Sequence, residues 1–181
     1  MEKEKTLDRI SWKAEWTIYK WKDLDNRIAA FLQQGRSIED TTRFFGTQAV
    51  IEAMHDNVAL NEGLGELIDI ICGLGTPTKW DNSNARLGVG NSNTAAQATD
   101  TGLLGASKTF KAMDATYPQK SNQTAEWRST FGSAEGNYAW EEYTVVNAAD
   151  DAGKNLNRKV ESKGTKSSGE TWTLSLKITF S

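Results

Sequence analysis

The last eleven residues of the chain alternate strictly between apolar and polar side chains. The apolar positions are Trp172, Leu174, Leu176, Ile178 and Phe180. Side chains on a β-strand point alternately to the two faces of a sheet, so the pattern predicts a half-buried strand over 171–181. A chain end frays unless its neighbours hold it, and we therefore expect this strand to lie inside a sheet. Its polar face, which includes Ser175, offers hydroxyl groups and one lysine and no catalytic chemistry.

A second alternating segment, 11–21, also predicts a strand. Its apolar face consists of Trp12, Ala14, Trp16 and Ile18. From Asp23 the apolar spacing becomes helical, first in a stripe made by Leu24, Ile28, Phe31 and Leu32. Ser37 followed by Asp40 is typical of a helix start. The helical spacing then continues through Val50, Ile51, Met54 and Val58.

The clearest helical pattern follows Asn61, which is predicted to cap the helix. Its apolar stripe consists of Leu64, Leu67, Ile68, Ile71 and Cys72. Gly73, Gly75 and Pro77 end the helix. We expect the stripe to face the core of the protein, with Cys72 behaving as a small buried apolar residue.

After Pro77 the composition shifts to Gly, Asn, Ser, Thr and Ala, and strands are predicted at 86–90, 123–131, 138–146 and 155–162. In 123–131 the alternation places Trp127 and Phe131 inside and Arg128 and Thr130 outside. Strands of this spacing favour an antiparallel β-sandwich or a barrel-like sheet. We expect an α+β fold in one domain, 1–181. Residues 23–75 form a helical insertion, and the β-rich body of 79–181 is completed by strand 11–21.

The composition argues against several classes of partner. The chain has 181 residues, a formal net charge of −3 and a sequence pI near 5.3. It has no dense basic run, so nucleic acid is not the expected partner. No apolar stretch is long enough to span a membrane, and Met1–Arg9 lacks the apolar core of a secretory signal. Cys72 is the only cysteine, which excludes an internal disulfide framework and fits assembly in a reducing host cytoplasm.

Reactive side chains are scarce. His55 is the only histidine and is expected at the surface of a helix, whereas catalytic triads and most zinc sites need a histidine in a defined constellation. The sequence shows no base that would activate the Cys72 thiol as a nucleophile. We therefore predict that the chain is not an enzyme and has no catalytic residues, no cofactor and no metal.

Two motifs are similar to ligand-binding loops, but for both of them a structural role is favoured over a binding role. Gly88 and Gly90 open a glycine-rich loop pattern, but they favour a bent strand or a close backbone approach. The run of Asp81, Asn82, Ser83 and Asn84 contains calcium-type oxygen ligands, yet such runs usually make turns through their own hydrogen bonds.

Glu141 and Glu142 are adjacent, so on a strand they face opposite sides and cannot act as a close carboxylate pair. We expect Glu142 to be buried in a structural ion pair with Arg128 or Arg158.

The tryptophans fall into two groups. Trp12, Trp16, Trp127, Trp140 and Trp172 are expected in the core, where large aromatic side chains dominate burial. Trp21 and Trp80 lie outside the clearest patterns and are the candidate exposed anchors of a protein interface, where tryptophan is enriched.

The order of several segments resembles a group of tailed-bacteriophage virion proteins. The segments are NVALNEGLGELIDIICGLG, WDNSNARLGVGNSNTAAQATDTGLLG, FKAMDATYP, QTAEWRSTFGSAEGNYAWEEYTVVN, LNRKVESKGTK and TWTLSLKITFS. With SWKAEWTIYKW they cover about two thirds of the chain, mostly from Asn57 onward, whereas 23–56 departs from the group. The group comprises capsid-decorating, head-fibre and minor tail proteins, and supplies no catalytic residues.

The resemblance implies a structural protein of the virion, present in multiple copies and bound to the major capsid protein or to other virion proteins. A capsid decoration (cement) protein is the first hypothesis, and a tail, neck or baseplate protein is the second. A carbohydrate-binding adsorption module that uses exposed tryptophans is a third, from a different class.

Overall fold

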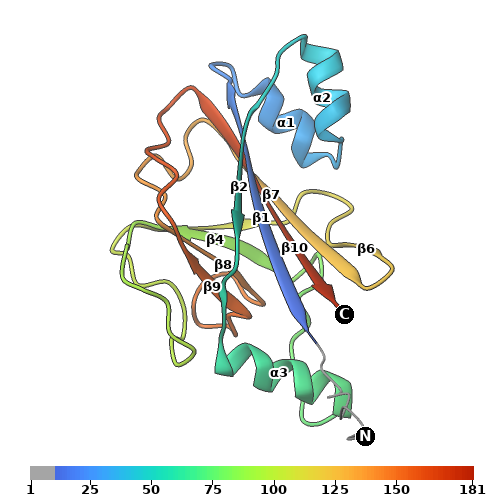
Figure 1. Ribbon diagram of the computed structural model, residues 1–181. Coiled ribbons are helices and arrows are strands. Elements are labelled where there is room, and N and C mark those ends of the chain that lie inside the picture. Colours follow the sequence, from blue (N-terminus) through green and yellow to red (C-terminus); the bar gives the residue numbers. More distant parts are fainter. Residues whose placement is uncertain (1–10) are drawn as a thin grey trace, which may run out of the picture.

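The computed structural model describes residues 11–181 and shows a sandwich of two five-stranded antiparallel sheets (Figure 1). The opening segment Met1–Arg9, for which the sequence predicts no secretory signal, lies outside the described residues. In the first sheet the strands run in the order β2-β1-β10-β7-β6, and in the second β3-β9-β8-β4-β5. The predicted α+β fold with a β-sandwich is confirmed.

The first sheet consists of β1 (Trp12–Lys22), β2 (Val50–His55), β6 (Gln119–Ser121), β7 (Thr124–Phe131) and β10 (Glu170–Phe180). The second consists of β3 (Val58–Ala59), β4 (Arg86–Gly90), β5 (Lys108–Ala112), β8 (Glu142–Val146) and β9 (Asn157–Val160). The helices are α1 (Arg27–Gln33), α2 (Ile38–Phe45) and α3 (Asn61–Cys72). In Figure 1, α1 and α2 lie at one end of the sandwich and α3 lies at the other.

The strand predicted at the end of the sequence is confirmed as β10, and it lies in the middle of its sheet. It pairs with β1 along its whole length, from Trp12 opposite Phe180 to Lys22 opposite Glu170. Its other edge pairs with β7. Both edges of β10 are therefore hydrogen-bonded, which holds this segment in place.

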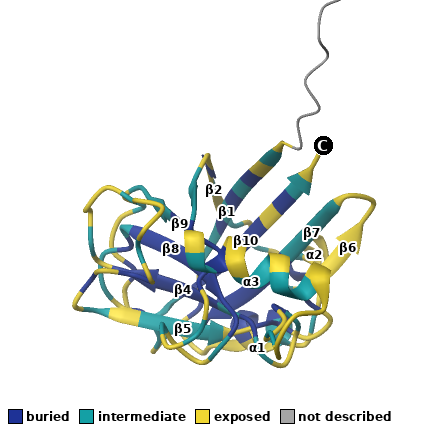
Figure 2. Cartoon of the chain, turned by 90° about the horizontal axis from the view of Figure 1, so that it is seen from below, coloured by how far each residue is buried: buried dark blue, intermediate teal, exposed yellow. Residues whose placement is uncertain are grey.

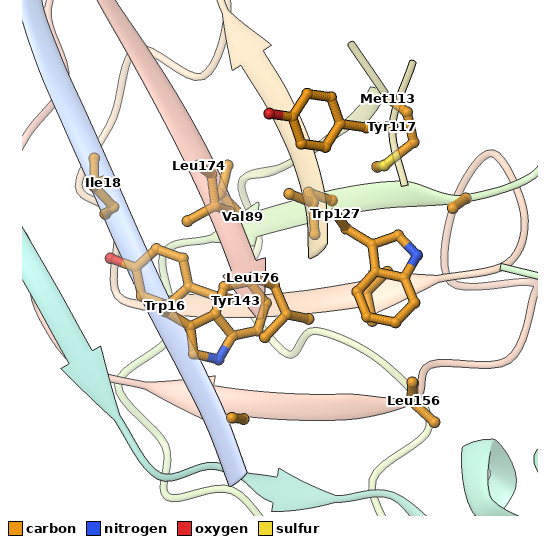
Figure 3. Packing of buried hydrophobic residues seen from close by; sticks show 14 of the residues in the cluster. Trp16, Ile18, Val89, Met113, Tyr117, Trp127, Tyr143, Leu156, Leu174 and Leu176 are labelled. Atoms are coloured by element: carbon orange, nitrogen blue, oxygen red, sulfur yellow. The ribbon is translucent and has the colours of Figure 1, made fainter. Parts of the chain in front are cut away.

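The main core lies between the two sheets (Figure 3). Trp16 and Leu176 face each other across β1 and β10 and are fully buried, with Tyr143 of the second sheet packed against Trp16. Trp140 meets Phe131 and Trp172 edge to face, with ring centroids 4.8 and 4.9 Å apart. Edge-to-face contacts of this kind add to the stabilisation from burying aromatic area.

The other face of the first sheet is also covered, which corrects the sequence prediction for its polar residues. Alternation predicts that Arg128, Thr130 and Ser175 point outward to solvent, but each is at most 3% exposed. The start of the insertion accounts for much of this cover: α1 packs on the sheet through Ile28 and Leu32, which form a small second core with Trp21. Hydroxyl groups on this face hydrogen-bond to one another and to carboxylates, so their burial is tolerated.

Asp23 fastens α1 to the sheet. Its two carboxylate oxygens accept hydrogen bonds from the backbone N–H groups of Ile28 and Ala29, at 3.1 and 3.0 Å. The Thr171 hydroxyl donates to the same carboxylate at 2.7 Å. A carboxylate at the start of a helix satisfies free N–H groups and opposes the positive end of the helix dipole.

The helical spacing predicted over 50–58 is wrong, because these residues form the edge strand β2 and the short strand β3. β2 pairs with β1, with Ile51 opposite Tyr19. Short apolar runs rich in branched residues fit either a helix or a strand, and here pairing with β1 decides between them. His55 is exposed as expected, but it ends a strand instead of lying on a helix.

Candidate interaction surfaces

Trp21 and Trp80, predicted as exposed anchors, are buried, so the prediction of their exposure is wrong. Trp21 is 2% exposed and lies under α1, and Trp80 is 7% exposed and belongs to the main core. The indole N–H of Trp80 donates to the carbonyl of Lys154 at 3.2 Å. Trp21 and Trp80 lie outside the alternating patterns because helix and loop segments bury them. A periodic pattern in the sequence does not reveal contacts of this kind. Among the tryptophans, all of which lie within 11–181, Trp12 alone is half-buried and the others are buried.

The Asp81–Asn84 run and the glycines of β4 have structural roles. Asp81 accepts hydrogen bonds at one oxygen from the backbone N–H groups of Ser83 and Asn84, both at 3.1 Å, which is the turn that the sequence favours. Residues 11–181 contain no group of three or more His, Cys, Asp and Glu residues that could hold a metal ion. Gly90 lies on β4, and a side chain there would collide with the Glu142 carboxylate.

Glu142 is fully buried and pairs with Arg158, which decides between the two partners that the sequence allows. Its carboxylate lies 2.7 Å from Arg158 and accepts hydrogen bonds from the backbone N–H groups of Leu104 and Gly105, at 2.9 and 2.6 Å. Arg158 also pairs with Asp100 at 3.0 Å. This network ties the loop between β4 and β5 to the second sheet.

The other candidate, Arg128, forms a separate buried pair with Asp114 at 2.8 Å. Its guanidinium group also donates to the carbonyls of Leu32 and Arg36, at 3.1 and 2.8 Å. Burial raises the pKa of Asp114, and the charge of Arg128 opposes that shift. Arg128 therefore connects β7 to the segment that joins α1 to α2.

Lys166 provides a prediction on pH. Its ammonium group is buried and donates to the carbonyl of Gly132 and the side-chain oxygen of Asn137, at 2.7 and 2.9 Å. Burial lowers the pKa of Lys166 to about 8 from 10.5. Between these two pH values the unfolded chain binds more protons than the folded chain, so the free energy of unfolding rises with pH.

We expect this gain to be absent in Lys166→Met, which has no proton to release. In urea titrations, the free energy of unfolding of the wild type should rise from pH 7 to pH 10 by about 1 to 3 kcal/mol more than that of the variant. A difference between the two proteins that stays constant over this range would contradict the assignment.

α3 exposes its apolar stripe to solvent, which corrects the expectation that the stripe faces the core (Figure 2). The exposed side chains are Leu64, Ile68, Ile71 and, just after the helix, Leu74, at 38%, 54%, 71% and 56%. Cys72 is exposed beside them. We call the exposed face of α3 that Leu64, Ile68 and Ile71 form the α3 surface.

The opposite face of α3, which carries Glu62, Glu66 and Ile70, contacts the body. Glu62 accepts a hydrogen bond from the backbone N–H of Asn155 at 2.7 Å, and Glu66 accepts one from the backbone N–H of Thr78 at 2.6 Å. A side chain at Gly63 would collide with the backbone of Leu156. The helix is thus attached by two carboxylates, by the close approach at Gly63 and by the partly buried Ile70, which packs against the main core. Leu60, not Asn61, occupies the cap position, without a side-chain hydrogen bond.

Helices α1 and α2, at the opposite end of the sandwich (Figure 1), carry a second set of exposed apolar side chains. Phe31 of α1 stacks on Phe44 of α2 with ring centroids 5.0 Å apart, and Phe44 is 65% exposed. Arg36 lies over the ring of Phe31 at 5.6 Å. With Arg43 these side chains line a shallow hollow. We call Phe31, Arg36, Arg43 and Phe44 the hairpin surface.

Sequence reasoning misses both surfaces. Helical spacing identifies the apolar stripe of α3 but assigns it to the core, and no pattern singles out Phe44. Val50 and Ile51 of the edge strand β2 are also exposed, and the sequence places them in the helical pattern that the structure corrects.

Comparisons with protein-family models, with curated proteins and with solved structures found no match to the chain. Within residues 11–181, no helix has the length and apolar character that crossing a membrane requires.

Proposed function

We propose that the chain is a structural protein of a tailed-phage virion, and that it decorates the capsid by binding capsid subunits. The observation that carries the proposal is the placement of exposed apolar side chains at two opposite ends of a braced β-sandwich (Figure 1). Contiguous exposed apolar side chains mark surfaces that bind other proteins. A rigid body with one such surface at each end can connect two neighbours in an assembly.

The rigidity of the body supports the same proposal. The terminal strands pair along their full length, and two buried ion-pair networks fix the loop between β4 and β5 and the α1–α2 segment. A protein that strengthens a shell by bridging its subunits must itself resist deformation. Several segments of the sequence resemble phage decoration and tail proteins, and this resemblance is our reason for proposing the virion as the assembly.

We assign capsid binding to the hairpin surface. Aromatic and arginine side chains are enriched at the energetically dominant positions of protein interfaces. Phe31, Phe44, Arg36 and Arg43 provide both kinds of side chain in one place. The surface lies within 23–56, the part of the sequence that departs from the phage group, which suits contacts that are specific to one shell.

The test is saturation binding of the purified chain to empty, expanded heads of the phage. We expect binding to saturate at a fixed number of copies per head. Phe44→Glu should weaken it at least 10-fold, because it places a charge in the aromatic contact. Leu104→Glu, a change at a 50% exposed leucine outside both surfaces, is the matched control and should bind like the wild type. Binding only to tails, or equal binding by the two variants, would contradict the proposal.

A further inference from the structure

We propose that the α3 surface binds a second copy of this chain, with the two α3 helices packed antiparallel about a two-fold axis at Ile68. The outward side of α3 carries no charge within the helix. At 3.6 residues per turn, six residues share that side: Asn61, Leu64, Gly65, Ile68, Ile71 and Cys72. The charged Glu62 and Glu66 point to the chain's own body, where they accept hydrogen bonds. Asp69, the third charged residue of α3, is half-buried and lies at the edge of the outward side, beside Gly65.

Gly65 indicates that another backbone or a bulky side chain approaches this face. Glycine weakens a helix interior relative to alanine, so its presence needs a reason. For Gly63 the reason is internal, because a side chain there would collide with Leu156. A side chain at Gly65 would meet nothing within 4 Å. Nothing in the described chain explains Gly65, whereas a partner lying across the helix does.

The α3 surface is complementary to itself. In a two-fold antiparallel pair centred on Ile68, Leu64 and Ile71 lie on one side of the axis in both copies, and Gly65 and Cys72 lie on the other side. Ile71, 71% exposed, therefore packs against Leu64 of the other copy. Cys72 lies over the open space at Gly65 of the other copy, and the Ile68 side chains meet on the axis. Large apolar side chains thus meet on one side, and the small residues let the two backbones approach on the other.

Charge complementarity favours a second copy as the occupant. Antiparallel packing places the positive end of one helix beside the negative end of the other. The last turn of α3 has no basic residue. Lys154 lies 3.9 Å from Glu62 at the start of the helix and is half exposed. In the pair, Lys154 is beside the carbonyl end of the other α3. The centre of the surface is uncharged and offers nothing to nucleic acid or to a highly charged protein. The Asp69 carboxylates lie at the edge of the contact, one residue from the axis, and their like charge limits the affinity of the pair.

The size of the surface sets the expected affinity. A twelve-residue helix is about 18 Å long, so the helix pair alone covers less than the roughly 800 Å² per partner of a standard interface. We expect a weak dimer, with a dissociation constant on the order of 10–500 µM. Such contacts gain strength when many copies are held on one shell.

The first test is sedimentation velocity of the pure full-length chain from 5 to 500 µM. The wild type should shift from monomer to dimer over this range. Ile68→Glu should remain monomeric, because it places like charges on the axis. Leu24→Glu, at a 90% exposed leucine near the other end, is the control and should dimerise like the wild type. A wild type that stays monomeric throughout, or a dimer that survives Ile68→Glu, overturns the proposal.

The second test examines the register. Gly65→Leu should raise the melting temperature of the monomer, because leucine favours helix, and should weaken dimerisation at least 10-fold by occupying the space where Cys72 of the other copy lies. Ile68→Cys in a Cys72→Ser background should oxidise to a disulfide-linked dimer, because the two positions meet on the axis. Tight dimerisation by Gly65→Leu, or the absence of this cross-link, overturns the register.

These measurements use the pure chain alone. Failure to bind heads would leave the α3 result intact. Conversely, a monomeric chain that binds heads normally and loses binding through Ile68→Glu would assign the α3 surface to a capsid subunit and would overturn only the self-association.

Discussion

Glu142→Gln should lower the free energy of unfolding by about 3 kcal/mol. Removing one charge from a buried pair leaves its partner uncompensated, which costs roughly 3 to 5 kcal/mol. Arg158 retains Asp100 as a second partner, and this places the expected loss at the lower end of the range. The glutamine also brings an N–H group toward the backbone donors of Leu104 and Gly105, which need an acceptor. Urea unfolding at pH 7 measures the loss.

The neighbouring residue provides the control. Glu141 is only partly buried and its side chain accepts one hydrogen bond, from Ser162 at 2.9 Å, so Glu141→Gln should change stability by less than about 1 kcal/mol. Native-state hydrogen exchange gives a local readout. In Glu142→Gln the amides of Leu104 and Gly105 should exchange faster, because their shared acceptor is weakened. Equal stability of the two variants, or unchanged exchange at those amides, would show that the network does not hold the loop.

Leu176→Ala should destabilise the protein by about 2 to 5 kcal/mol, through lost burial and the cavity left behind. Leu176 is fully buried at the centre of β10, opposite Trp16 on β1 and Trp127 on β7. Large neighbours on both sides, fixed by strand pairing, have little freedom to fill the space. Thermal or urea unfolding of the two proteins measures the difference.

Lys177→Ala is the matched control on the same strand. The Lys177 side chain is 49% exposed and lies 3.6 Å from Glu126, a surface pair that contributes little. The variant should differ from wild type by less than about 0.5 kcal/mol. Comparable losses at 176 and 177 would mean that β10 is not buried on one face at this point.

The pairing of β1 with β10 shows what the sequence could predict. Strict alternation in both segments identifies the strands and their apolar faces, because a period of two matches a strand and does not match a helix. Alternation says nothing about what covers the polar face. Arg128, Thr130 and Ser175 are as buried as their apolar neighbours, and hydrogen bonds satisfy their polar groups. Burial of polar side chains depends on partners that are distant in the sequence.

α3 shows the corresponding limit for the candidate surfaces. Helical spacing correctly groups Leu64, Ile68 and Ile71 on one face. It cannot tell whether that face meets the protein's own core or a partner, because both give the same pattern. The informative signals are Glu62 and Glu66, and they become visible only when the structure places their hydrogen-bond partners beside them.

The proposed role of this chain as a building block of a virion shell can be tested by quantitative mass spectrometry of purified, DNA-filled heads separated from tails. We predict a fixed number of copies per head, in a simple ratio to the major capsid protein, as icosahedral symmetry requires. Heads that lack the chain, or carry it in variable trace amounts while tails or the host cell fraction contain it, would contradict the claim.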